Sequence, residues 1–134
     1  MIVADTNLVV YSVIPGPHDR EVDMVRAKDH DWIAPPLIRS ELLTVLANYM
    51  HRNLLDRDDA VRTFKHAMTL LTVIEREVDA VSVLNLCRGT GCSSYDAEFV
   101  WLARESNVKV VAADREMLRA FPHVSASFSE FANS

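Results

Sequence analysis

Four acidic residues are the side chains of this sequence most able to do chemistry together. Asp5, Asp96 and Asp114 stand where a predicted strand or loop passes into a helix, and Glu41 lies inside a long predicted helix. Two carboxylates about 4 Å apart repel by roughly 4 kcal/mol at an effective dielectric near 20, so a cluster needs protonation or a cation. Carboxylate oxygens select Mg²⁺ or Mn²⁺ over zinc, and such ions catalyse phosphodiester hydrolysis. The sequence therefore predicts one acidic, metal-binding pocket.

Short apolar strands that alternate with amphipathic helices must position these acids. The alternation predicts an α/β fold with a mostly parallel sheet, and ligands collect at the carboxyl edge of such a sheet. Asp5 and Asp114 each follow a predicted strand and so belong to that edge. Strands are predicted at 2–4, 32–34, 71–74, 108–112 and 124–126, and helices at 19–28, 36–52, 56–70, 78–88, 94–106 and 115–120.

Helical geometry predicts which way Asp96 faces. Residues advance by about 100° each around a helix axis, which places Asp96 on the apolar face with Val100 and Ala103. Glu98 falls on the opposite face, beside Trp101. An inward carboxylate must be paired, protonated or bound to a metal, because burying an uncompensated charge costs several kcal/mol.

Helix capping is the alternative explanation for the aspartates. Asp5 and Asp114 are suitable caps for the helices that follow them, and Asp96 can form a capping box with Ser93. Glu41 lies beside the apolar stripe of its helix, beyond the cap position, and is expected to be partly buried. Capping explains each aspartate singly, whereas a shared pocket explains the four acids together.

Composition bounds the remaining possibilities. The chain has 134 residues, 49% hydrophobic and 25% charged, which predicts a single domain over 1–134. The net charge is −5, and leaving out the four acids changes it to −1, so much of the acidity belongs to the predicted site. No apolar run approaches the roughly 18 residues of a membrane span, which favours a cytoplasmic location. Cys87 and Cys92 fit neither a zinc site nor a disulfide framework.

Four motifs together resemble a known family. They occur in the order and spacing of a PIN domain, and the compact form resembles the VapC-like toxins of toxin–antitoxin pairs. The motifs are the run 2–7 (IVADTN), 40–42 (SEL), 94–97 (SYDA) and 110–114 (VVAAD). The resemblance extends over 2–131 and implies a three-layer α/β/α sandwich.

The resemblance also implies an activity. A VapC-like PIN domain is expected to be a Mg²⁺- or Mn²⁺-dependent endoribonuclease that forms a homodimer and is inhibited by a VapB-like antitoxin protein. The metal would lower the pKa of a bound water, neutralise the scissile phosphate of the RNA and orient in-line attack. Asp5, Glu41, Asp96 and Asp114 match the acidic quartet of the family and are the expected catalytic residues and metal ligands.

Further residues are expected to support this site. Asn7 matches a polar residue that steadies the acids, and Thr6, Ser40 and Glu116 are further candidates. Arg39 and Arg115 are candidate phosphate contacts. One position departs from the family pattern: many relatives carry Ser or Thr two residues before the last aspartate, where this chain has Ala112.

Other functions remain open at this point. A housekeeping PIN nuclease without an antitoxin would carry the same acids. A non-catalytic PIN-like binding module is expected to have lost a metal ligand, and none is missing here. A haloacid dehalogenase-like phosphotransferase also begins with a strand and an aspartate, but it needs a second aspartate where this chain has Asn7. A receiver-like signalling domain needs paired acids after the first strand and a lysine after the last, where Arg115 follows Asp114.

Overall fold

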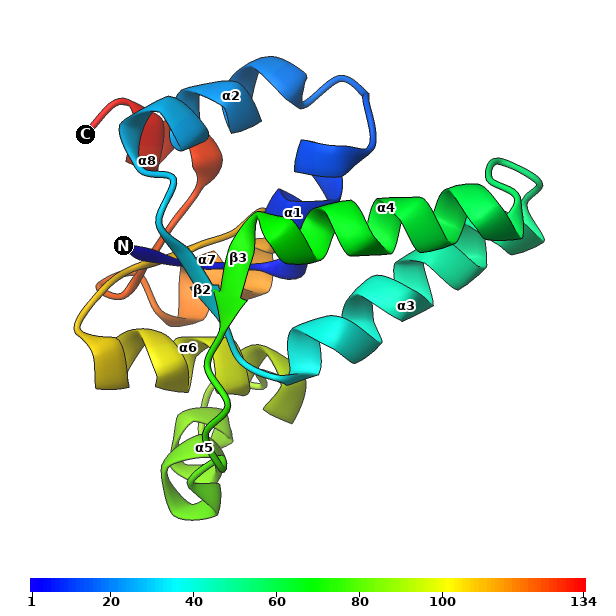
Figure 1. Cartoon of the computed structure of the whole chain (residues 1–134). Coiled ribbons are helices and arrows are strands. Elements are labelled where there is room, and N and C mark those ends of the chain that lie inside the picture. The colour runs from blue at the N-terminus through cyan, green and yellow to red at the C-terminus, as the bar shows by residue number, and fades with distance from the viewer.

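A single parallel sheet organises the molecule. The computed structural model describes all residues from 1 to 134 and contains five strands in the order β3-β2-β1-β4-β5, with every neighbouring pair parallel. Strand β1 is central, so both of its faces and both of its edges are covered, and its residues are completely apolar (Figure 1). The strands are β1 Ile2–Ala4, β2 Trp32–Ala34, β3 Leu71–Val73, β4 Val110–Val111 and β5 Ser125–Ala126.

Eight helices cover the two faces of this sheet. Helix α6 packs on β1 and β4 with α5 outside it, whereas α1, α2, α3 and α4 form the opposite layer, where α8 packs on α2 (Figure 1). This arrangement confirms the predicted three-layer α/β/α sandwich. The helices are α1 Thr6–Val13, α2 Asp19–Lys28, α3 Leu37–His51, α4 Arg57–Thr69, α5 Ala80–Cys87, α6 Ser94–Ser106, α7 Arg115–Ala120 and α8 Phe128–Ala132.

Most elements lie where the sequence predicted them, but the bounds of α1 were not predicted and α8 was not predicted at all. Helix α1 was not delimited because its sequence is rich in β-branched residues, which lower helix propensity. Its residues Leu8, Val9 and Val10 are buried, so tertiary packing stabilises a helix that local propensity does not favour. Helix α8 begins with a capping box between Ser127 and Glu130, a signal that is present in the sequence.

The face of α6 opposite Asp96, on which the sequence placed Glu98 and Trp101, is covered rather than open to solvent. Trp101 is only 5% exposed, because α5 packs over the side of α6 that faces away from the sheet. Its ring also contacts the Arg76 guanidinium, 5.8 Å from the ring centroid, and its indole Nε1 has no hydrogen-bond partner. Glu98 is half-buried rather than exposed. Helix α6 is therefore a central helix that is buried around most of its circumference.

None of the eight helices combines the length and the hydropathy that crossing a membrane requires.

Candidate active site

Asp5 and Asp114 lie at the topological switch point of the sheet, after the neighbouring strands β1 and β4. Strands β2 and β3 extend the sheet on one side of β1, and β4 and β5 extend it on the other. Asp5 follows β1 directly, Asp114 follows β4, and the Asp5 amide donates to the Val111 carbonyl at 3.2 Å. The crevice outside the carboxyl ends of strands at such a switch point is the usual ligand site of an open α/β sheet.

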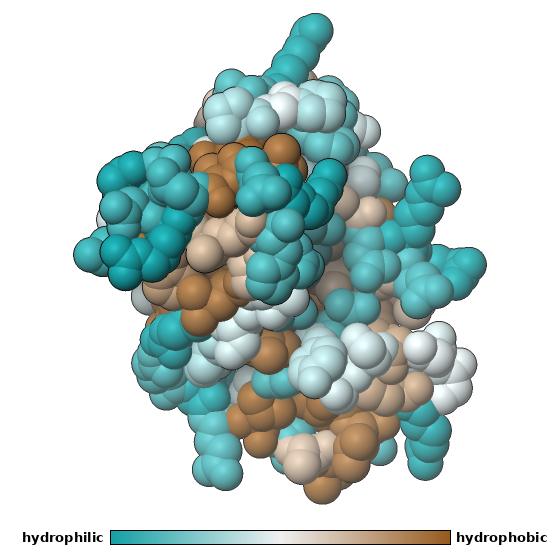
Figure 2. Space-filling model, turned by 90° about the vertical axis from the view of Figure 1, so that its right-hand side faces the viewer, coloured by the Kyte–Doolittle hydropathy of each residue, from teal (hydrophilic) through white to brown (hydrophobic).

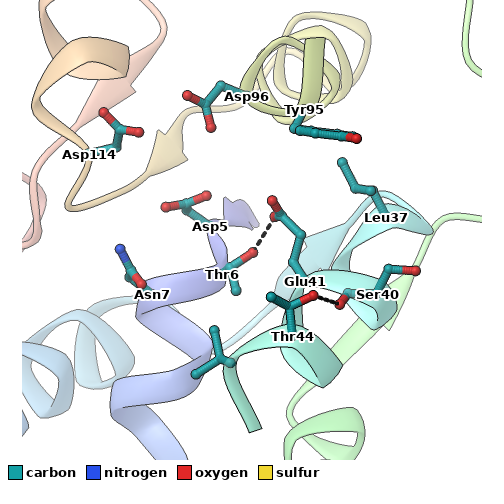
Figure 3. A pocket seen from close by; sticks show the side chains of 11 residues that line it. Asp5, Thr6, Asn7, Leu37, Ser40, Glu41, Thr44, Tyr95, Asp96 and Asp114 are labelled. Carbon is teal, nitrogen blue, oxygen red and sulfur yellow. Dashed lines mark hydrogen bonds between the residues drawn. The ribbon is translucent and has the colours of Figure 1, made fainter. Parts of the chain in front are cut away.

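The other two acids come from helices on opposite layers. Asp96 lies in the first turn of α6, whose start is capped by the Ser93 hydroxyl accepting from the Asp96 amide at 3.1 Å. Glu41 lies in the second turn of α3, which begins just after β2 ends. Figure 3 shows the side chains of Asp5, Glu41, Asp96 and Asp114 around one opening, so segments far apart in sequence meet there.

One pocket of about 650 Å³ contains all four acids. Its remaining lining mixes polar and apolar side chains. The polar residues are Thr6, Asn7, Ser40 and Thr44, and the apolar or aromatic ones are Leu37, Val45 and Tyr95. No lysine, arginine or histidine lines it, so no positively charged side chain in its walls compensates the four carboxylates.

Asp5 at the base of the pocket carries the largest electrostatic penalty. Its side chain is buried, with the residue 6% exposed, and this burial raises the pKa of Asp5 from 3.8 to about 7. The Thr6 backbone N–H opposes the rise in pKa by hydrogen bonding, whereas the charges of Glu41, Asp96 and Asp114 add to it. The negative form of Asp5 is therefore unfavourable at neutral pH without a counter-charge.

The same electrostatics extend to Asp96 and beyond the pocket. Burial and the nearby charge of Asp114 raise the pKa of Asp96 to about 6. Burial followed by the charge of Glu41 also raises the pKa of Glu98. The Cys92 thiol has its pKa raised to about 11 by burial and then by Asp96, so it stays protonated. A negative potential thus covers the carboxyl edge of the sheet.

Helix capping accounts for only part of the aspartate placement. Asp114 is a cap for α7, because its Oδ1 accepts from the amides of Glu116 at 2.8 Å and Met117 at 3.2 Å. Asp5 precedes α1 but makes no side-chain capping bond, so capping does not explain it. At α6 the cap is Ser93, and no reciprocal capping box with Asp96 forms. Asp5 and Asp96 therefore keep their carboxylates available to the pocket.

Glu41 is held in place by a neighbour from another element. The Thr6 hydroxyl of α1 donates to Glu41 Oε1 at 2.6 Å, which joins α1 to α3 across the pocket (Figure 3). Thr6 is itself buried, so the bond is sheltered from competition by water.

Comparison with known proteins agrees with this geometry. The model of the PIN domain family matches residues 2–122. The chain belongs to the PIN domain family. The crystal structure of PAE2754 from Pyrobaculum aerophilum is similar in fold to this PIN domain, with a TM-score of 0.79 and 17% identity over 98% of this chain and 92% of that chain. Among curated proteins no sequence match was found.

Family membership supports a general nuclease activity. PIN domains are generally nucleases that act on RNA and use divalent metals. The haloacid dehalogenase-like alternative has no support from this match. The receiver-like alternative is wrong, because receiver domains have the strand order 2-1-3-4-5, and this PIN domain has 3-2-1-4-5.

Several predicted supporting residues lie away from the pocket of this PIN domain. Thr6, Asn7 and Ser40 line it, but Glu116 does not and is exposed on α7. Arg39 forms an ion pair with Glu75, and Arg115 is exposed on α7; neither lines the pocket.

The structure adds pocket residues that sequence reasoning did not single out. Thr44 and Val45 follow Glu41 by three and four positions, so helical spacing could have placed both on its face. Tyr95 directly precedes Asp96 within the motif that carries the family resemblance. Leu37 precedes Glu41 by four positions in α3, so the same spacing places it on that face as well.

The donor chemistry of the PIN pocket fits a hard divalent cation. Its carboxylates, hydroxyls and the Asn7 amide offer oxygen donors, and burial raises the pKa of its most buried carboxylate, Asp5. No three His, Cys, Asp or Glu side chains stand close enough together to form a ready-made metal cluster. That spacing is compatible with Mg²⁺, which proteins commonly hold through one or two carboxylates and several waters.

The raised pKa of Asp5 predicts how stability depends on pH. Because the folded state binds the Asp5 proton more tightly than the unfolded state, the metal-free protein loses stability as pH rises from about 4 to about 7. Asp5→Asn removes this penalty. Relative to the parent, the variant should gain about 2 to 3 kcal/mol in free energy of unfolding between pH 5 and pH 8, measured by urea denaturation with EDTA present.

The matched control is Asp23→Asn, which removes an exposed carboxylate of α2. Its stability difference from the parent should change by less than about 0.5 kcal/mol between the same two pH values. An Asp5→Asn difference that stays constant with pH would show that the buried carboxylate carries no such penalty.

Proposed function

We propose that this PIN domain is a divalent-metal-dependent endoribonuclease that hydrolyses RNA phosphodiester bonds, with residues 1–134 forming one nuclease domain. Asp5, Glu41, Asp96 and Asp114 are its proposed catalytic residues and hold Mg²⁺ or Mn²⁺. The observation that carries the proposal is the buried Asp5, which shares a pocket with three further acids and no basic group. The fold uses Asp5 for no cap, so its burial is best explained by a bound cation.

Each carboxylate of the pocket has its own proposed role. Asp5 forms the base of the pocket, and Asp114 presents Oδ2, since its Oδ1 is occupied by the amides of α7. Asp96 comes from α6, in the layer opposite the one that carries Glu41, and Glu41 is oriented by Thr6. A bound Mg²⁺ or Mn²⁺ would lower the pKa of a water and neutralise charge on the scissile phosphate. No histidine or lysine lines the pocket to act as a base, which agrees with activation of the water by the metal.

The site predicts the effect of removing single carboxylates. Asp96→Asn and Asp5→Asn should each lower the rate of RNA cleavage by more than about 100-fold with the fold intact, because each removes a metal-binding charge. The measurement is cleavage of a mixed RNA pool during titration with Mn²⁺, with circular dichroism as a check of folding. Asp23→Asn should cleave like the parent at every Mn²⁺ concentration. Parent-like cleavage by both site variants would refute the proposed function.

The hydrogen bond between Thr6 and Glu41 supports a separate prediction. Thr6→Val keeps the shape of the side chain but cannot donate, so Glu41 loses its orienting partner. Cleavage should fall by about 10- to 100-fold, in the range seen when groups that orient metal ligands are removed. Thr6→Ser keeps the hydroxyl and should retain most of the activity. Equal activity of the Val and Ser variants would exclude an orienting role for this bond.

A narrower role is also proposed: the toxin of a VapBC-like pair, acting in the cytoplasm as a homodimer and inhibited by a VapB-like antitoxin. Supporting this, helix α5 leaves apolar side chains uncovered, with Val81 68% and Leu84 65% exposed. Figure 2 shows hydrophobic residues gathered at the lower end of the molecule, where α5 lies. An uncovered apolar helix face is typical of a protein-binding surface.

The toxin role predicts a protein partner. Expressed with the small reading frame beside its gene, the chain should co-purify with that product, and the complex should cleave RNA at least about 10-fold more slowly than the free chain. A chain that binds no such product but still cleaves RNA would instead be a housekeeping PIN nuclease.

A further inference from the structure

Tyr95 is an aromatic side chain that the fold does not use for packing. It lies in the first turn of α6 and is 59% exposed, although it is next to Asp96 in sequence. Tyr11 offers a contrast, because its ring stacks on His18 with a centroid distance of 4.2 Å and meets Phe128 edge-on. The start of α6 is already capped by Ser93, so Tyr95 is not needed there either.

The ring instead borders the acidic pocket. Tyr95 and Leu37 both line it, and they come from helices on opposite layers of the sandwich. Figure 3 shows the Tyr95 ring at the rim, with Leu37 across from it and the Glu41 carboxylate beside them. An exposed aromatic face at the entrance is therefore adjacent to the groups proposed to act on the phosphate.

The charge of the pocket makes such a face important. RNA is a polyanion, and proteins usually gain affinity for it from lysine and arginine contacts to phosphate. Here four carboxylates and no basic side chain line the pocket, and Arg39 is paired with Glu75. Contacts that do not depend on charge must then contribute to holding the nucleotide. Stacking of a base on an aromatic ring is the strongest contact of this kind that the rim offers.

We propose that Tyr95 is the stacking platform for an unpaired base next to the scissile phosphate. This inference rests on the proposed ribonuclease function and assigns a positioning residue to its site. A base in a duplex is already stacked on both faces, so it would have to leave the duplex before it could use the ring. Tyr95 thus acts as a positioning residue that places the neighbouring phosphate over the acids.

The test uses a single-stranded oligoribonucleotide that the parent cleaves at one mapped linkage. Tyr95→Ala should lower kcat/KM by about 5- to 100-fold, the loss expected for one base–aromatic stack, mainly through KM. Tyr95→Phe keeps the ring and should stay within about twofold of the parent. Leu54→Ala, which removes a similarly exposed apolar side chain that does not line the pocket, should have no effect. The same sequence in a duplex should be cleaved at least about tenfold more slowly.

A second substrate separates stacking from a merely structural role. The base on each side of the cleaved linkage is replaced in turn by an abasic ribose. One of the two replacements should slow cleavage by the parent and bring its rate to that of Tyr95→Ala. If Tyr95 only stabilised α6, Tyr95→Ala would stay impaired on both abasic substrates. Any of three results would overturn the stacking role. They are impairment of Tyr95→Ala on both abasic substrates, parent-like cleavage of intact RNA by Tyr95→Ala, and cleavage of the duplex at the same rate as the single strand. A parent that cleaves no RNA would overturn the proposed function and the role of Tyr95 with it.

Discussion

Burial of several carboxylates in one partly enclosed pocket is the constraint on which the arrangement of this protein depends. Burial disfavours the charged form of a carboxylate, and like charges nearby disfavour it further. No basic residue lines the pocket to offset this, and the cost appears in the pKa values of Asp5 and Asp96, which burial raises most and the neighbouring carboxylates raise further. A fold can keep such an unfavourable site only when the rest of its core supplies enough stability. Here the buried hydrophobic core that surrounds the sheet supplies it.

The scaffold holds each acid by a different local device. The end of the central strand positions Asp5, and the amides at the start of α7 hold Asp114. Ser93 begins the helix that carries Asp96, and Thr6 orients Glu41. Because these devices belong to separate elements, the pocket exists only when both layers are docked on the sheet. The site is therefore coupled to the stability of the whole domain rather than to one loop.

The charge distribution also determines how a nucleic acid can approach. With a net charge of −5 and an acidic pocket, long-range electrostatics repel RNA from the site. A bound divalent cation would therefore serve binding as well as chemistry. Ion pairing of Arg39 with Glu75 removes one nearby positive charge from this task. The uncharged lining residues, among them Tyr95 and Leu37, are then the part of the wall that does not repel a nucleotide.

The sequence by itself determined the order of the elements and the acids that belong to their ends. Strand 2–4, strand 32–34 and the helices Asp19–Lys28 and Ser94–Ser106 have the predicted bounds, because hydrophobic period and capping act over a few residues. The helix predicted from position 56 likewise begins there, with Asp56 as its cap accepting from the Asp59 amide. The strand predicted at 108–112 is confined to Val110–Val111, since strand ends depend on pairing with neighbours.

Only the tertiary structure decided which of these local features meet. The bond from Thr6 to Glu41 spans 35 positions of sequence, and no local pattern encodes it. Burial of Trp101 depends on α5 folding over α6, and helix α1 forms because packing overrides its β-branched sequence. The docking of the helices likewise put Tyr95 at the pocket and kept Arg39 and Arg115 off it. Local propensity acts along the chain, whereas burial, charge proximity and pocket shape arise between segments that only the folded state brings together.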